Sequence, residues 1–237
     1  EDDGIPEAGA VELEVVLREA RYEARPMATP VVDGAIADWP ADMEAMILDT
    51  ASATVVNRQV YGGDADLRVT VRAGWSAVGL HLAVAVEDDA LVDAPERPAW
   101  ESDGVELYVD GRPEDERPPT YGPGVSQLVL PALRPVAGRL EGNRAWEVDE
   151  LAWTVRPRDG GYVLEATLPF DRIRAAPWRP AAGDSLRFDL MVNDRDDLAG
   201  TQSHHRLWST GSAASTTAGY GVVVLGSLGF ENAYAFA

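Results

Sequence analysis

Short apolar segments, most of which alternate with polar or small residues, recur along the chain. They cover residues 67–72, 78–86, 105–110, 126–130, 162–169, 186–193 and 220–225. A period of two is typical of β-strands with one buried face, and turn signals rich in Gly, Pro and Asp separate the segments. No substantial helical period appears. The pattern predicts an all-β protein, an antiparallel β-sandwich with a jelly-roll or immunoglobulin-like arrangement.

The segment 100–110 carries the most chemistry. Val105, Leu107 and Val109 alternate with Glu106, Tyr108 and Asp110, so one face enters the core while the other presents polar side chains. Trp100 lies just upstream, in a loop that contains two prolines. An aromatic ring beside a carboxylate can stack on the C–H face of a sugar and accept hydrogen bonds from its hydroxyls. This arrangement indicates a binding site rather than a catalytic one.

Composition narrows the choice of partner. The chain has 237 residues, 46% hydrophobic and 25% charged, and a formal charge of −20. An acidic protein lacks the basic footprint that nucleic acids and anionic membranes require. No apolar run reaches the roughly 18 residues of a membrane span. The absence of cysteine excludes disulfides, thiolate zinc sites and a cysteine nucleophile.

We expect three parts along the chain: an N-terminal extension, 1–30, with a strand over 11–17; the sandwich domain, 31–228; and a C-terminal tail, 229–237. Within the domain we expect one helical turn over 42–48 and a short strand over 57–61. The chain begins at Glu1 rather than methionine. Removal of a signal peptide fits this start, as does an excised fragment, and we favour a secreted or cell-surface protein.

The order of these segments resembles the family 9 carbohydrate-binding modules (CBM9) and their wider DOMON-like relatives over about residues 31–228. The segments that carry the resemblance are Val32–Trp39, Val86–Asp89, Trp100–Asp110, Tyr162–Pro169, Gly183–Asp194 and Trp208. The resemblance implies a β-sandwich, often attached to secreted polysaccharide-degrading enzymes, that clamps a terminal sugar between two tryptophans. It implies Trp100 and Trp208 as the clamp and Glu106 as the carboxylate. His205 stands where the family usually has an amide, which puts the sugar preference in question.

Two acidic segments are candidate calcium sites, because carboxylate oxygens are the ligands that Ca²⁺ prefers. One contains Asp194, Asp196 and Asp197, and the other contains Asp88 and Asp89. Neither completes an EF-hand. The resemblance implies structural calcium, and a plain acidic surface is the alternative.

Haem and catalysis are disfavoured. His81 and Met191 are the imaginable axial ligands of a DOMON-like haem site, but no motif supports them. Glycoside hydrolysis needs two carboxyl groups across the scissile bond, and Glu106 has no evident second carboxyl. No Gly-x-Ser-x-Gly nucleophile elbow is present.

We therefore expect a non-catalytic carbohydrate-binding protein whose ligand-binding residues are Trp100, Glu106, Tyr108, His205 and Trp208. Its partners would be a glycan and a linked catalytic domain or a cell surface. The alternative is a structural subunit of a surface layer, fibre or exported complex that associates with like subunits and has lost the sugar site. The strand at 11–17, the apolar tail at 229–237 and His205 motivate that alternative.

Overall fold

The computed structural model describes residues 20–174, 178–209 and 212–227. The strands are β1 (Arg21–Pro26), β2 (Met46–Leu48), β3 (Thr54–Val56), β4 (Leu67–Trp75), β5 (Gly79–Asp88), β6 (Gly104–Asp110), β7 (Val125–Pro131), β8 (Ala152–Arg158), β9 (Gly161–Pro169), β10 (Ser185–Asp194), β11 (Ser203–Arg206) and β12 (Gly221–Leu225). Helices are short: the 3₁₀ turns η1 (Ile36–Asp38), η2 (Arg58–Val60), η3 (Ala99–Glu101), η4 (Glu114–Glu116) and η5 (Val148–Glu150), and α1 (Phe170–Ile173).

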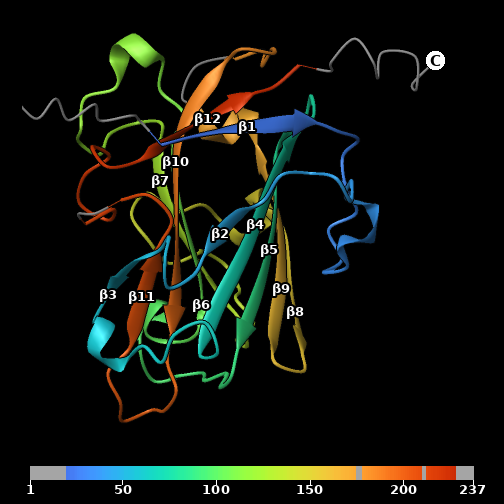
Figure 1. Ribbon diagram of the computed structural model, residues 1–237. Helices are drawn as coiled ribbons and strands as arrows, with labels where there is room; N and C mark the ends of the chain where they lie inside the picture. Colours follow the sequence, from blue (N-terminus) through green and yellow to red (C-terminus); the bar gives the residue numbers. More distant parts are fainter. Residues whose placement is uncertain (1–19, 175–177, 210–211, 228–237) are drawn as a thin grey trace, which may run out of the picture.

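The strands form two sheets. The first contains β3, β11, β12, β10, β6 and β7, and the second contains β2, β4, β5, β9 and β8. Strand β1 runs parallel to both β12 and β4 and so joins the two sheets, whereas the other strand pairings are antiparallel. Figure 1 shows the first sheet on the left, the second on the right and β1 crossing near β12. The predicted all-β sandwich is confirmed, with β1 as the parallel exception.

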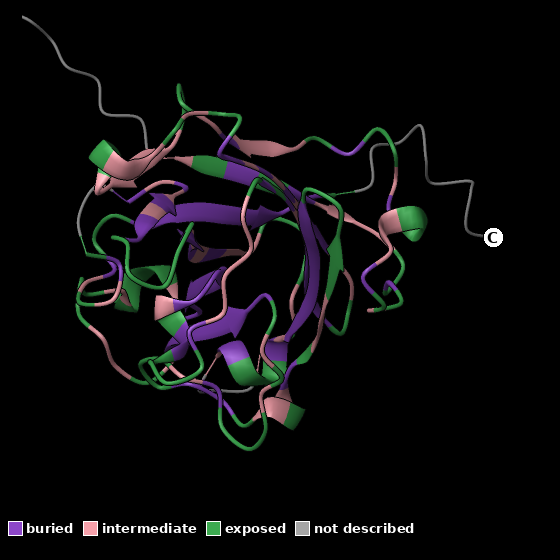
Figure 2. Ribbon diagram, turned by 90° about the horizontal axis from the view of Figure 1, so that it is seen from below, coloured by how far each residue is buried: buried purple, intermediate pink, exposed green. Residues whose placement is uncertain are grey.

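The core lies between the sheets, because each alternating strand turns its apolar face inward. Val105 and Leu107 of β6 join Leu82 and Val84 of β5 and Phe188 of β10 in one buried cluster. Figure 2 shows buried residues concentrated on the strands and exposed residues on the surrounding loops. Burial of this apolar surface is the main force that holds the two sheets together.

A loop covers part of the outer face of the second sheet. Glu165 of β9 is buried there and accepts hydrogen bonds from the backbone N–H groups of Asp33 and Gly34, at 3.1 and 2.6 Å. Its other oxygen accepts from Trp39 Nε1 at 2.8 Å. The same face holds His81, whose ring nitrogens lie 2.9 Å from Thr167 Oγ1 and 2.9 Å from Ser76 Oγ. The hydrogen bonds of Glu165 hold the loop over residues 31–43 against this face.

Two local predictions were wrong. Residues 46–48, expected in a helical turn, form β2, because pairing with β4 overrides the weak local preference. Residues 58–60, expected in a strand, form η2, whose preceding residue Asn57 has a left-handed φ of 57° that interrupts an extended chain. The strand that pairs with β11 lies just before it, at β3.

The chain ends bear on the expected domain limits. Strand β1 precedes the expected domain start at residue 31 and pairs within the sandwich. The expected strand at 11–17 and the tail at 229–237 lie outside the described residues. In the part of the chain that the structure describes, no helix is long and apolar enough to cross a membrane.

Candidate functional site

The outer face of the first sheet gathers polar side chains from four strands. The strand register places Glu106 opposite Met191, Tyr108 opposite Gln127, and Asn193 opposite His204. Residues opposite one another on one face of a sheet have Cβ atoms roughly 4.5–5.5 Å apart. The register therefore brings Glu106, Tyr108, Gln127, Met191, Asn193, His204 and Arg206 to one surface.

This surface forms a pocket of about 580 Å³, within the usual range for small-ligand sites. Trp100, from η3, lines the pocket with a side chain that is 42% exposed, and Glu106 and Tyr108 line it from β6. Asn143 and the segment 212–214 complete the lining, and Asn143 Nδ2 donates to the carbonyl of Ala214 at 2.7 Å. The pocket thus combines an exposed aromatic ring with a polar surface, which suits a ligand with both apolar faces and hydroxyl groups.

Glu106 is the centre of the polar surface and is only 2% exposed. One carboxylate oxygen accepts from Tyr108 O–H and from Gln127 Nε2, both at 2.6 Å, and the other accepts from Asn193 Nδ2 at 2.8 Å. Tyr108 donates to this carboxylate, and burial together with the negative charge of Glu106 raises the tyrosine pKa well above its usual value. These three hydrogen bonds offset much of the cost of burying the Glu106 carboxylate, and they hold its side chain and those of its partners in fixed positions.

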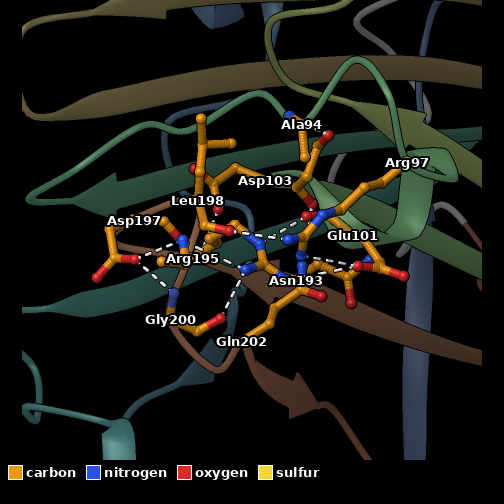
Figure 3. Close-up of polar contacts among 12 residues, drawn as sticks. Ala94, Arg97, Glu101, Asp103, Asn193, Arg195, Asp197, Leu198, Gly200 and Gln202 are labelled. Atoms are coloured by element: carbon orange, nitrogen blue, oxygen red, sulfur yellow. Dashed lines mark hydrogen bonds and ion pairs between the residues drawn. The ribbon is translucent and has the colours of Figure 1, made fainter.

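Arg195 holds the loop that carries Trp100 (Figure 3). Its side chain is 4% exposed, and Nε donates to the carbonyl of Glu101, the residue after Trp100, at 2.7 Å. Nη1 donates to the carbonyls of Gly200 at 2.8 Å and Asp197 at 3.3 Å. The Arg195 backbone N–H donates to Asp103 at 2.7 Å. The guanidinium therefore connects η3 with the loop that follows β10.

His205 and Trp208 do not line this pocket in the structure. His205 is buried on the opposite side of β11 from His204, with Nε2 2.8 Å from Ser203 Oγ and its ring edge-on to Tyr61 at 4.4 Å. Adjacent residues of a strand face opposite ways, so His204 takes the pocket position. The Trp208 ring packs on Phe188, with centroids 6.3 Å apart, and lies directly against Gly221, where a Cβ would collide with it.

Carboxylates gather beside the pocket loops. Asp88, Asp103 and Asp194 bring one oxygen each within 4.8 Å of one another, and so do Asp66, Asp194 and Asp196. Burial raises the pKa of Asp88 to about 7, that of Asp103 to about 9 and that of Asp196 to about 6, and the neighbouring carboxylates contribute to each shift. The ionised forms of these carboxyl groups would thus repel one another and would be poorly solvated.

The donor set of this acidic cluster fits a hard cation. Asp88 Oδ2, Asp194 Oδ1 and the Tyr162 hydroxyl are buried and have no hydrogen-bond partner among the described residues. Buried polar atoms rarely remain unpaired, and convergent carboxylate oxygens are calcium ligands. Two residues of the expected set lie outside the two groups: Asp197 accepts from the N–H groups of its own loop, and Asp89 is in neither group.

The two imaginable haem ligands lie on different sheets. His81 is buried on the outer face of the second sheet, whereas Met191 lines the pocket on the first. Burial lowers the His81 pKa to about 4. The structure therefore does not bring these two side chains together.

Sequence reasoning missed several residues of both sites. Gln127, Asn193 and His204 are on the pocket face, and Asp66 lies in the acidic cluster. Asp103, also in the acidic cluster, accepts hydrogen bonds from the backbone N–H groups of Val92 and Arg195. Extending the period of two along β7, β10 and β11 would have placed the first three on the polar face.

The family model described as carbohydrate family 9 binding domain-like matches residues 41–228. The chain belongs to this family. Among solved structures, a family 9 module from Caldicellulosiruptor kristjanssonii in complex with cellotriose is 19% identical, with a TM-score of 0.70 over 90% of this chain and 96% of that one. The same module in complex with glucose is 18% identical, with a TM-score of 0.70 over 89% and 97%.

A putative carbohydrate-binding protein from Bacteroides uniformis is 11% identical, with a TM-score of 0.55 over 88% of this chain and all of that one. No curated protein matches the chain. At these identities the likeness to solved structures establishes the fold alone. The family 9 assignment thus agrees with the resemblance seen in the order of the sequence segments. The sandwich agrees with the fold expected from the sequence.

Proposed function

We propose that this chain is a non-catalytic carbohydrate-binding module that holds a sugar in the pocket of the first sheet. The observation that carries the proposal is the exposed Trp100 ring beside the polar surface around Glu106, in a chain of the family 9 carbohydrate-binding class. Structural neighbours were solved with cellotriose and glucose, which supports a glucose-containing ligand. Such a module would bring a linked enzyme or a cell surface to polysaccharide outside the cell.

Trp100 would stack on the apolar face of a sugar, while Gln127, Asn143 and His204 would form hydrogen bonds with its hydroxyls. Glu106 would act mainly by fixing Tyr108 and Gln127, because three donors already occupy its oxygens. A second stacking ring at Trp208 would require that side chain to leave Phe188 and Gly221. We therefore assign the stacking to Trp100, and a Trp208→Ala variant tests whether the clamp forms on binding.

The pocket argues for binding rather than hydrolysis. Among the described residues that line it, Glu106 is the one acidic side chain. Glycosidases of the common type need two carboxyl groups, one on each side of the scissile bond. The Glu106 carboxylate is buried and held by hydrogen bonds, a state suited to orienting neighbours.

Isothermal titration calorimetry with glucose and cellotriose tests the proposal. We expect saturable binding and at least a tenfold rise in Kd for Trp100→Ala, because loss of a stacking ring removes both buried apolar area and ring-face contact. Leu198→Ala is the control, since it shortens another exposed apolar side chain (54% exposed) on a neighbouring loop. Equal affinity of wild type and Trp100→Ala would refute this site.

We also propose that the acidic cluster binds Ca²⁺ and that Asp88, Asp103 and Asp194 supply ligands. Calcium at 100 times its Kd would stabilise the folded chain by about 2.7 kcal/mol, which is about 5–10 °C in Tm for a chain of this size. Asp88→Asn should abolish the shift, whereas the exposed Asp115→Asn should leave it unchanged. A Tm in chelator equal to that in Ca²⁺ would contradict the assignment.

A further inference from the structure

Three polar side chains form a continuous path across the pocket surface. Asn193 of β10 lies between Glu106 of β6 and His204 of β11, and the strand register places Asn193 directly opposite His204. Asn193 Nδ2 lies 2.8 Å from Glu106 Oε1, and Asn193 Oδ1 lies 2.6 Å from His204 Nδ1. Asn193 is 1% exposed, so water does not replace these partners.

The direction of each hydrogen bond along this path follows from Glu106. An ionised carboxylate only accepts, and it receives hydrogen bonds from Tyr108, Gln127 and Asn193. Because the Asn193 amide group turns its NH₂ towards Glu106, its oxygen faces His204. Two acceptors cannot bond to each other, so His204 Nδ1 must carry a proton.

The other ring nitrogen then has the opposite character. In a neutral imidazole one nitrogen donates and the other accepts, so Nε2 of His204 carries a lone pair. Burial and the nearby positive charge of Arg206 lower the His204 pKa to about 4, so the ring is neutral at physiological pH. No group in the described part of the chain hydrogen-bonds Nε2, and the half-buried ring lines the pocket.

We propose that His204 is a specificity-determining residue of this pocket and that its Nε2 accepts a hydrogen bond from a sugar hydroxyl. Asn193 is the positioning residue that fixes the ring and the tautomer. The inference rests on the proposed sugar-binding function and adds the direction of one hydrogen bond: the ligand must place a hydroxyl group that donates to Nε2. A group that can only accept would meet the Nε2 lone pair unfavourably.

The first arm of the test uses the sugar-free protein. The chain has three histidines, so a long-range ¹H–¹⁵N spectrum assigned with His81→Gln and His204→Asn variants is simple to interpret. At pH 7 we expect His204 to show a protonated Nδ1 and an unprotonated Nε2. A proton on Nε2, or a doubly protonated ring, would overturn the inference whether or not any sugar binds.

The second arm measures binding. In His204→Asn the shorter side chain can still donate to Asn193 but does not reach the Nε2 position. Loss of one neutral hydrogen bond predicts a rise in Kd for cellotriose of about 2–10-fold. The monodeoxy derivatives of glucose then identify the partner hydroxyl: one derivative should bind wild type more weakly than glucose does and lose nothing further in His204→Asn.

The outcomes separate the two claims. Unchanged affinity of His204→Asn would overturn the role of His204 while leaving the sugar site intact. The same holds if, for every deoxy sugar, the loss of affinity from the missing hydroxyl and the loss from His204→Asn simply add. If wild type binds neither glucose nor cellotriose, the proposed function fails and the sugar role of His204 fails with it. The spectrum of the free protein still reports the tautomer separately in that case.

Discussion

Arg195→Met is the sharpest test of how the loop carrying Trp100 is held. Methionine keeps most of the apolar stem but removes the donors that reach the carbonyls of Glu101 and Gly200, at 2.7 and 2.8 Å. The backbone N–H of residue 195, which donates to Asp103, remains. The substitution therefore isolates the guanidinium contacts shown in Figure 3.

The cost follows from the two short bonds. A hydrogen bond that involves a charged group contributes about 1.5–3 kcal/mol, which gives an upper range of about 3–6 kcal/mol for the pair. Gly200 is exposed, so water can replace the donor to its carbonyl. The ion pair of Arg195 with Glu101, at 3.8 Å and with Glu101 37% exposed, adds little. We therefore expect a loss of about 2–3 kcal/mol in the free energy of unfolding.

Urea unfolding followed by tryptophan fluorescence measures this loss. For an m value of about 2–3 kcal/mol/M, the midpoint should fall by about 1 M. Arg158→Met, at an exposed position of β8, is the matched control and should stay within about 0.5 kcal/mol of wild type. Cellotriose affinity should also fall in Arg195→Met, because the backbone beside Trp100 loses its support. A stability and an affinity both equal to those of the control would refute the reasoning.

Two further predictions concern the second sheet. Glu165→Gln should lower the free energy of unfolding by about 1–3 kcal/mol, because one amide oxygen cannot accept from both the Trp39 indole and the two backbone N–H groups. Chemical denaturation of Glu165→Gln, Trp39→Phe and the double variant should show that the effects of the two substitutions on the free energy of unfolding are not additive. Burial lowers the His81 pKa from 6.5 to about 4, so the unfolded chain binds the proton more readily. The contribution of neutral His81 to the free energy of unfolding is complete above about pH 6.5 and falls by about 3 kcal/mol as the pH drops through 4. The free energies of unfolding of wild type and His81→Gln, measured against pH, should therefore diverge between about pH 6.5 and 4. Parallel pH profiles would contradict the assignment.

Much of the fold was predictable because burial imposes a strict period of two. On β6, Val105 and Leu107 enter the core and Glu106 faces outward, as the alternation indicates. The sequence did not indicate how buried the outward face would be. Loops that carry Trp100 and Asn143 cover it, and loop paths depend on contacts distant in sequence, such as Asn143 with Ala214.

Where the structure differs from the pattern of alternation, the cause can be identified. The pairing of β2 with β4 decides the conformation of residues 46–48, and no local pattern contains that information. Trp208 follows the end of β11, where Asp189 accepts from the backbone N–H groups of Trp208 and Ser209 and sets the direction of the chain. Alternation does not extend past such a turn. For this reason the alternation along β11 does not predict which way the Trp208 ring points.

The acidic cluster shows what pairing adds to sequence. Asp194 and Asp88 were evident as members of acidic segments, but Asp66 and Asp103 come from elsewhere in the chain. Strands β4 and β5 pair so that Leu67 lies opposite Asp88, which brings Asp66 to the same end of the hairpin. Asp103 arrives from the turn before β6. Four separate segments thus supply two groups of carboxylates that share Asp194, and only the folded structure reveals them.

The indole ¹H–¹⁵N spectrum during titration with cellotriose tests the central claim most directly. The chain has seven tryptophans, and their cross-peaks are assigned by substitution. We predict a saturable shift of the Trp100 peak, with unchanged peaks for Trp153 of β8 and for Trp39, which lies in the loop that covers the second sheet. Saturable binding that leaves the Trp100 peak in place and moves the peaks of the second sheet would contradict the account and put the sugar site elsewhere.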